Sequence, residues 1–267
     1  MFLTSCSLPG NLFSLPNNDQ RLETLNLLNQ NSFKEETLET PYFEIYSLNK
    51  IKNSEKVIIY IEGDGVSWID RSTISSNPTP TDPLAFRLAK IDNSDNVIYL
   101  ARPCQYIEGS NCNNNEIWTI SQYSDAVLSS YKGIIDTFAK QFKEIHLVGY
   151  SGGAGIAMYL GSINNEKIKS IRTIAGNINH NRLSQLIKIS PLRKSISFYE
   201  IEDMTRAVPQ VHYIGNEDKV IPKELSLSFK NNNKINKCIK IKEVDATHNK
   251  RWDMFWINEY SNLPSCS

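Results

Sequence analysis

The sequence predicts an α/β protein with a mainly parallel central sheet and helices on both faces. Short apolar runs alternate with longer amphipathic stretches along the chain, a pattern typical of parallel strands connected by helices. Several runs are apolar throughout, which indicates strands that are buried on both faces. The run at residues 145–150 leads directly into a glycine-rich turn and then a helical stretch.

The elements before this turn follow from spacing and from breaker residues. Leucines at helical intervals predict the first helix, and Pro41 interrupts an alternating stretch so that two edge strands are expected. Pro83 suits the first turn of a helix. In order, we expect a helix at 19–30, two antiparallel edge strands within 37–48, buried strands at 56–62 and 96–101, and helices at 82–90 and 122–141.

The elements after the turn continue the alternation. In order, we expect a helix directly after the turn, a strand at 168–174, a mixed segment at 177–207, a strand at 208–214, a helix at 222–229, a strand at 238–244 and a final helix around Trp252. The mixed segment contains Pro191 and predicts a small cap or lid. Residues 1–19 are expected to form a lipobox-like N-terminal segment and a flexible tether, because residues 7–19 are rich in Pro, Asn and Ser. Residues 20–267 then form a single domain.

The composition excludes some classes of partner. The chain has 267 residues, of which 40% are hydrophobic and 22% charged, as in ordinary globular proteins. Lys and Arg together number 29, as do Asp and Glu, so no basic excess indicates nucleic-acid binding. No apolar run approaches the roughly 20 residues of a membrane span. We expect a monomer.

The five cysteines indicate the cellular compartment and the possible disulfide bonds. Cys6 ends a Leu-Thr-Ser-Cys stretch that resembles a bacterial lipobox, so we expect an acylated, membrane-anchored lipoprotein of the cell envelope, facing the periplasm. The residues before Cys6 are too few for an export signal, and a cytoplasmic protein with reduced thiols stays open. Cys104 and Cys112 bracket one loop and are paired first, which leaves Cys238 and Cys266 as the second pair. The spacing lacks a C-x-x-C pair, so no metal site is expected.

The glycine-rich turn carries the first candidate for chemistry. Residues 149–153 read Gly-Tyr-Ser-Gly-Gly, which is the G-x-S-x-G pattern of a nucleophile elbow between a strand and a helix. Gly149 and Gly153 allow the strand and helix to approach closely, and Ser151 is expected on a strained backbone. The alternative is a simple strand-to-helix turn with an inert serine.

An elbow serine needs a base and an acid from later loops of the sheet. His248 follows the strand at 238–244 and is the only one of four histidines in such a loop. His146 and His212 lie within predicted strands and are expected to pack in the core. His180 precedes the cap and is expected in a loop. We therefore choose His248 as the base.

The acid is chosen from the loop after the strand at 208–214. Asp218 lies in that loop, at the carboxyl end of the strand where open α/β sheets place their sites. Glu217 is one residue away and would face the opposite side. Asp245 is too close in sequence to His248, and Asp203 lies in the cap region. We choose Asp218, with a plain turn aspartate as the alternative.

Backbone N–H groups are expected to hold the oxyanion. One belongs to Gly152, directly after the serine, and the other to the loop after the strand at 56–62. There we assign the Asp64 N–H, with Gly65 as the alternate. A carboxylate beside an oxyanion is unfavourable, so the Asp64 side chain is expected to point away, to Arg71, Arg102 or a backbone cap.

Two further expectations concern side chains near this loop. Glu62 is expected to organise the loop through hydrogen bonds. Trp68, Tyr106 and Trp118 either line a substrate pocket or are ordinary core and loop aromatics.

Together these features resemble the α/β-hydrolase superfamily and, more narrowly, bacterial and often lipoprotein α/β hydrolases of uncertain substrate. The resemblance covers about residues 40 to 257 and is carried by residues 60–65 with Trp68, residues 78–85, residues 99–106 with Cys112 and Trp118, residues 148–153 and residues 210–215. It implies an α/β-hydrolase fold, a triad of Ser151, Asp218 and His248, and a disulfide between Cys104 and Cys112.

The resulting hypothesis is a serine hydrolase that cleaves a carboxylic ester through an acyl-enzyme. It needs no metal or organic cofactor, and it takes a small-molecule ester or lipid-like substrate. Two alternatives remain: a thioesterase or peptidase with the same triad, and a catalytically silent lipoprotein that uses a hydrolase fold for binding.

Overall fold

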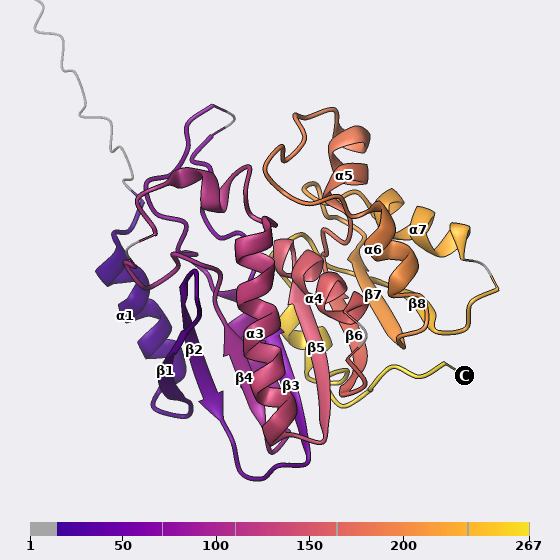
Figure 1. The fold of residues 1–267 in the computed structure, drawn as a ribbon, viewed down its shortest axis with the longest axis horizontal. Coiled ribbons are helices and arrows are strands. Elements are labelled where there is room, and N and C mark those ends of the chain that lie inside the picture. Colours follow the sequence, from indigo (N-terminus) through magenta and orange to yellow (C-terminus); the bar gives the residue numbers. More distant parts are fainter. Residues whose placement is uncertain (1–14, 71, 110, 164, 234, 267) are drawn as a thin grey trace, which may run out of the picture.

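The computed structural model describes residues 15–266 except 71, 110, 164 and 234. It contains one sheet with the strand order β1-β2-β4-β3-β5-β6-β7-β8 (Figure 1). The strands are β1 (Lys34–Glu39), β2 (Glu44–Lys50), β3 (Lys56–Ile61), β4 (Val97–Leu100), β5 (Glu144–Tyr150), β6 (Ile168–Ile174), β7 (Gln210–Gly215) and β8 (Ile239–Val244). Cys6 and most of the expected tether lie outside the described residues.

Helices connect and cover these strands. They are α1 (Asn18–Asn29), α2 (Leu84–Ile91), α3 (Asp125–Gln141), α4 (Gly152–Ser162), α5 (His180–Ile187), α6 (Tyr199–Met204), α7 (Lys223–Asn232) and α8 (Trp252–Trp256), with a short 3₁₀ helix η1 (Asn115–Trp118). The strands and helices predicted from the sequence are present with bounds within a few residues. None of the described helices is long and apolar enough to cross a membrane.

The sheet is parallel from β4 through β8, while β1 and β2 form an antiparallel edge. This confirms the predicted sheet and its edge. The carboxyl ends of the parallel strands share one edge, so the loops after β3, β5, β7 and β8 meet there.

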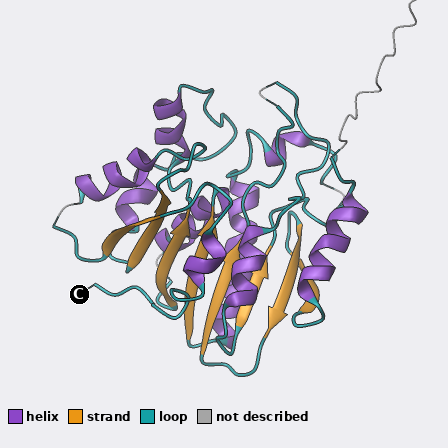
Figure 2. Cartoon of the chain, turned by 180° about the vertical axis from the view of Figure 1, so that it is seen from behind, coloured by secondary structure: helices purple, strands orange, loops and turns teal. Residues whose placement is uncertain are grey.

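Helices pack on both faces of the sheet (Figures 1 and 2). Ile59 and Ile61 of β3 pack with α3, α4 and α7 on one face, whereas Ile58 and Tyr60 pack with α1, α2 and α8 on the other. Burial on both faces explains why this strand is apolar at every position rather than at alternate ones.

The excursion between β6 and β7 contains α5 and α6, and α6 contacts α4. The expectation of a loop position for His180 is wrong: it is the first residue of α5 and is buried. Its ring stacks on Tyr123 with centroids 5.2 Å apart, and its Nε2–H donates to the Ile196 carbonyl at 2.8 Å. The contact with Tyr123 packs the segment between β6 and β7 against the rest of the domain.

Both expected disulfides are present. Cys104 bonds to Cys112 within the loop after β4, and Cys238 bonds to Cys266. The second bond links the start of β8 to the C-terminal segment.

Candidate active site

Ser151 lies in a tight turn between β5 and α4. Its backbone has φ 47° and ψ −117°, a conformation that is strained for a residue with a side chain. A Cβ atom on Gly153 would overlap the carbonyl oxygens of Ile61 and Glu62 at the end of β3. Close approach of α4 to β3 therefore requires glycine at 153, and the strained serine is held by packed regular structure.

Ser151, His248 and Asp218 form a continuous hydrogen-bond chain. The Ser151 Oγ lies 3.0 Å from His248 Nε2, and His248 Nδ1 lies 2.9 Å from Asp218 Oδ2. The Asp218 side chain is only 2% exposed, and its Oδ1 accepts from the N–H groups of Val220 and Ile221 at 2.8 and 3.0 Å. These bonds fix the carboxylate, which in turn orients the imidazole.

The other candidate acids are engaged elsewhere. Glu217 and Asp245 both pair with Arg251, at 2.7 and 3.1 Å, and Asp203 pairs with Arg206 at 2.5 Å. Of the carboxylates considered from the sequence, Asp218 is the one that contacts His248.

Two of the remaining histidines pack in the sheet as expected. The Nδ1 of His146 lies 2.8 Å from the Ser170 hydroxyl, and that of His212 lies 2.8 Å from the Thr173 hydroxyl. Burial lowers the pKa of His146 to about 4 and that of His212 to about 3. Both rings are therefore neutral core residues at physiological pH.

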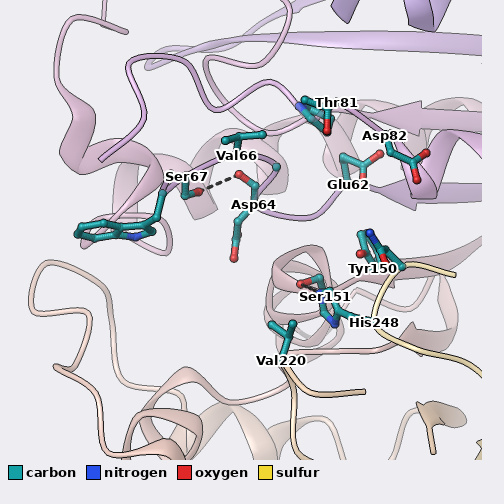
Figure 3. Close-up of a pocket in the computed structure, with 14 residues that line it drawn as sticks. Glu62, Asp64, Val66, Ser67, Thr81, Asp82, Tyr150, Ser151, Val220 and His248 are labelled. Atoms are coloured by element: carbon teal, nitrogen blue, oxygen red, sulfur yellow. Dashed lines mark hydrogen bonds between the residues drawn. The ribbon is translucent and has the colours of Figure 1, made fainter. Parts of the chain in front are cut away.

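The candidate oxyanion donors lie on either side of the elbow. Gly152 is the first residue of α4, and N–H groups in a first helical turn have no acceptor within the helix. Asp64 and Gly65 line the pocket beside Ser151. Among the described residues, no group accepts a hydrogen bond from the Asp64 N–H. The Ser67 hydroxyl donates to the Asp64 carbonyl at 2.8 Å and fixes this turn (Figure 3).

The Asp64 side chain pairs with Arg102, one of the three partners considered from the sequence, with Oδ1 and Nη1 2.8 Å apart. The expected orientation is wrong, because the carboxylate lies against Gly152, where an added Cβ would overlap it. Arg102 holds it there while stacking on Tyr123, whose hydroxyl donates to the Gly152 carbonyl at 2.9 Å. Burial raises the pKa of Asp64, and Arg102 opposes that rise. Arg71 lies outside the described residues.

Glu62 organises the loop after β3, as predicted. Its Oε1 accepts from the Gly63 N–H at 2.9 Å and from the Ala85 N–H, in the first turn of α2, at 3.4 Å. The side chain is 1% exposed, and burial raises its pKa to about 7.

Arg21 of α1 also fixes this loop, and sequence reasoning missed it. Its Nη1 donates to the carbonyls of Asn77 and Thr79 at 3.1 and 2.6 Å. From the other side, the Gln105 Nε2 donates to the Gly63 carbonyl at 3.0 Å. The only sequence signal was an arginine among the leucines of a predicted amphipathic helix, which does not identify a partner 56 residues away.

A pocket of about 390 Å³ opens above Ser151. Figure 3 shows its two walls: Glu62, Asp64, Val66, Ser67, Thr81 and Asp82 on one, and Tyr150, Ser151, Val220 and His248 on the other. Trp68 lines this pocket, Trp118 lines a small neighbouring cavity, and Tyr106 is buried in the core. Within the described part of the chain, no group of three or more His, Cys, Asp or Glu residues is placed to hold a metal ion.

Comparison with solved structures gives the same fold at low identity. Est1E from Butyrivibrio proteoclasticus superposes with a TM-score of 0.57 at 12% identity, covering 84% of this chain and 94% of that one. The Pyrococcus furiosus esterase Pf2001 superposes with a TM-score of 0.57 at 17% identity, covering 85% of this chain and 90% of that one. Carboxylesterase CesB (YbfK) from Bacillus subtilis superposes with a TM-score of 0.59 at 10% identity, covering 91% of this chain and 95% of that one. Comparison with curated proteins finds no match.

The family profile described as Serine hydrolase (FSH1) matches residues 103–247. This segment contains Ser151 and Asp218 and ends one residue before His248. The chain therefore belongs to the FSH1 serine hydrolase family and has the α/β-hydrolase fold.

Proposed function

We propose that this serine hydrolase cleaves carboxylic esters through an acyl-enzyme formed on Ser151. The observation that carries the proposal is the hydrogen-bond chain from the Ser151 Oγ through His248 to Asp218, at 3.0 and 2.9 Å. Both distances suit proton transfer and orientation of the base.

The proposed reaction has two halves. The His248 Nε2 accepts the Ser151 proton as Oγ attacks the ester carbonyl, and Asp218 stabilises the resulting imidazolium. The tetrahedral intermediate collapses to an acyl-serine as His248 returns the proton to the departing alcohol. A water molecule then repeats the attack with His248 as base, which releases the acid and restores Ser151.

The negative oxygen of the intermediate is stabilised by N–H groups of Gly152 and Asp64, with Gly65 as an alternate to Asp64. The N-terminus of α4 adds a favourable field at this point. The Asp64 carboxylate opposes that field, and Arg102, 2.8 Å away, offsets it. We therefore assign Arg102 a positioning and compensating role.

Hydrolysis of short p-nitrophenyl esters tests the proposal. The wild-type protein should release a burst of p-nitrophenol equal to the enzyme concentration if the acyl-enzyme accumulates. Ser151→Ala should lower kcat by about 10⁵- to 10⁶-fold while leaving the unfolding transition in place. Full activity in Ser151→Ala would overturn the proposal.

Matched oxygen ester, thioester and amide substrates separate the alternatives. A faster rate on the thioester or amide, after correction for each compound's own reactivity, would move the assignment to a thioesterase or peptidase. Absence of Ser151-dependent turnover on all three would favour a catalytically silent binding protein.

We also propose that Cys6 is acylated and anchors the protein in a bacterial cell envelope, facing the periplasm. The lipobox-like residues before Cys6 support this. Metabolic labelling with radioactive palmitate tests it: the label and membrane association should both disappear in Cys6→Ala. Membrane association that survives in Cys6→Ala would contradict it.

A further inference from the structure

The charged side chains that line the pocket carry mainly one sign. Asp64 and Asp82 line it, and no Lys or Arg does so among the described residues. Glu62 also lines it, but burial raises its pKa to about 7, so it does not count as a full negative charge. Of the described residues in the lining, only His248 is basic, and it acts in the proposed proton transfer. A substrate therefore meets carboxylates rather than cations around the scissile bond.

At the Asp82 position, negative charge exceeds positive charge. The Asp82 Oδ1 accepts from Arg87 Nη1 at 2.6 Å, but Arg87 Nε also donates to Asp253 at 3.0 Å. Two carboxylates thus share one guanidinium. The Asp82 side chain is 44% exposed and that of Arg87 only 22%, so the carboxylate is the more accessible partner.

Asp64, which lies nearer to Ser151, is likewise more exposed than its cationic partner. Its side chain is 28% exposed, whereas its partner Arg102 is only 6% exposed. Asp64 lines the pocket beside Ser151, and Arg102 does not line it. At both positions the acidic residue lines the pocket and its cationic partner does not.

Two aromatic rings also line the pocket. Trp68 is 46% exposed, so part of its indole is free to contact a ligand. Tyr150 lines the pocket next to the base, with ring centroids of Tyr150 and His248 5.4 Å apart. Aromatic faces combined with carboxylates are the chemistry that binds ammonium and guanidinium groups.

We propose that the pocket selects esters carrying a cationic group, an ammonium or guanidinium, on the acyl or alcohol side of the scissile bond, and rejects anionic esters. This inference rests on the proposed ester hydrolysis at Ser151. The acidic lining serves a second purpose, because hydrolysis adds water to the ester and yields an acid that ionises to a carboxylate. Repulsion by Asp64 and Asp82 favours departure of that product.

Matched esters test the inference. One series is the p-nitrophenyl esters of 4-(trimethylammonio)butanoate, 5,5-dimethylhexanoate and 4-sulfobutanoate, which have similar shapes and differ in charge. A second series, choline butanoate against 3,3-dimethylbutyl butanoate, places the cation on the alcohol. Each kcat/KM is divided by the rate constant of the same ester with hydroxide, which removes differences in intrinsic reactivity.

The cationic ester of at least one series should exceed its neutral partner by about tenfold, and the sulfonate should fall below the neutral ester by a similar factor. The preference should weaken between about 0.02 M and 0.5 M salt because ions screen the pocket charge. Asp82→Asn should reduce the cationic-to-neutral ratio by about threefold or more.

Asp245→Asn is the matched control. It removes the same charge from a side chain that is 79% exposed and outside the pocket lining, and it should leave the ratio unchanged. Two results would overturn the inference and leave the proposed function standing. One is Ser151-dependent hydrolysis with no preference for the cationic ester in either series. The other is a cationic-to-neutral ratio that Asp82→Asn and Asp245→Asn change equally. Hydrolysis of none of these esters in a Ser151-dependent manner would overturn both.

Discussion

The two walls of the pocket are built in different ways. The elbow wall, formed by Tyr150, Ser151 and His248, follows directly from strand ends and the start of α4. The acidic wall comprises residues 62–82, of which residue 71 is not described. Its described residues form a single isolated bridge, between Trp68 and Ile74, and no helix or strand. It is fixed instead by side chains that reach it from other parts of the chain.

The elbow wall carries the reacting groups, whereas the acidic wall is suited to substrate recognition. Strand packing and backbone hydrogen bonds hold the elbow wall, so its reacting atoms are placed by the fold itself. The acidic wall depends on Arg21, Arg102 and Gln105, whose side chains bond to its backbone or to Asp64. A loop on a rigid scaffold can change its lining without disturbing the sheet, which suits it to setting substrate preference.

The largest expected effect comes from removing the cation behind the acidic wall. Arg102→Met leaves the half-buried Asp64 carboxylate and the Gln122 carbonyl without their cationic donor, which should cost about 3–5 kcal/mol of stability. Urea denaturation measures the loss. Adding Asp64→Asn should recover part of it, because a neutral amide needs no cation. If the double variant were no more stable than Arg102→Met, the ion pair would not be the cause.

The contact between the two walls can be broken at Gly152. A Cβ at this position overlaps the Asp64 carboxylate, so Gly152→Ala should misplace the oxyanion donors and lower kcat by about 10²- to 10³-fold. In an Asp64→Ala background the overlap is gone, and the same substitution should cost much less. Equal losses in both backgrounds would contradict direct contact between the walls.

Glu62 should make stability depend on pH. Its pKa is raised from 4.5 to about 7 by burial, so the folded state favours the protonated carboxyl. The stabilisation is complete below about pH 4.5 and is lost as the pH rises through 7, a change of about 3 kcal/mol. Glu62→Gln cannot ionise, and its amide oxygen can still accept from Gly63 and Ala85.

The stability of Glu62→Gln minus that of the wild type should therefore increase with pH between about 4.5 and 8. Urea midpoints across that range provide the measurement. Parallel curves for the two proteins would show that this carboxyl does not titrate as the buried environment predicts.

The smallest expected effect is at Arg21, which holds the acidic wall from outside the pocket. Arg21→Met leaves the Asn77 and Thr79 carbonyls without this donor and should cost about 2 kcal/mol. Because Thr81 and Asp82 follow directly, kcat/KM should fall mainly through KM while the elbow remains intact. Arg21→Lys keeps the charge and should recover part of the loss. A fall in kcat alone would place Arg21's effect at the elbow instead.

The elbow wall could be predicted from the sequence because local patterns determine it. The strand, the Gly-Tyr-Ser-Gly-Gly turn and the following helix are contiguous, and the loops after β7 and β8 must reach the same sheet edge. That reasoning selected Ser151, Asp218 and His248, which the structure brings into contact.

The acidic wall could be predicted only in part. The role of Glu62 was anticipated, and Arg102 was one of three partners considered for Asp64, but the position of the Asp64 carboxylate against Gly152 was not anticipated. It depends on Tyr123 and Arg102 packing from segments distant in the sequence. The burial of His180 and the reach of Arg21 to residues 77 and 79 have the same origin: long-range contacts with no local signature.

Labelling with a fluorophosphonate probe is the most direct test of Ser151 as the nucleophile, because only an activated serine is phosphonylated rapidly. We expect a single adduct, located by peptide mass spectrometry on Ser151, absent in Ser151→Ala and formed far more slowly in His248→Ala. No adduct in the folded wild-type protein, or an adduct on another residue that persists in Ser151→Ala, would contradict it.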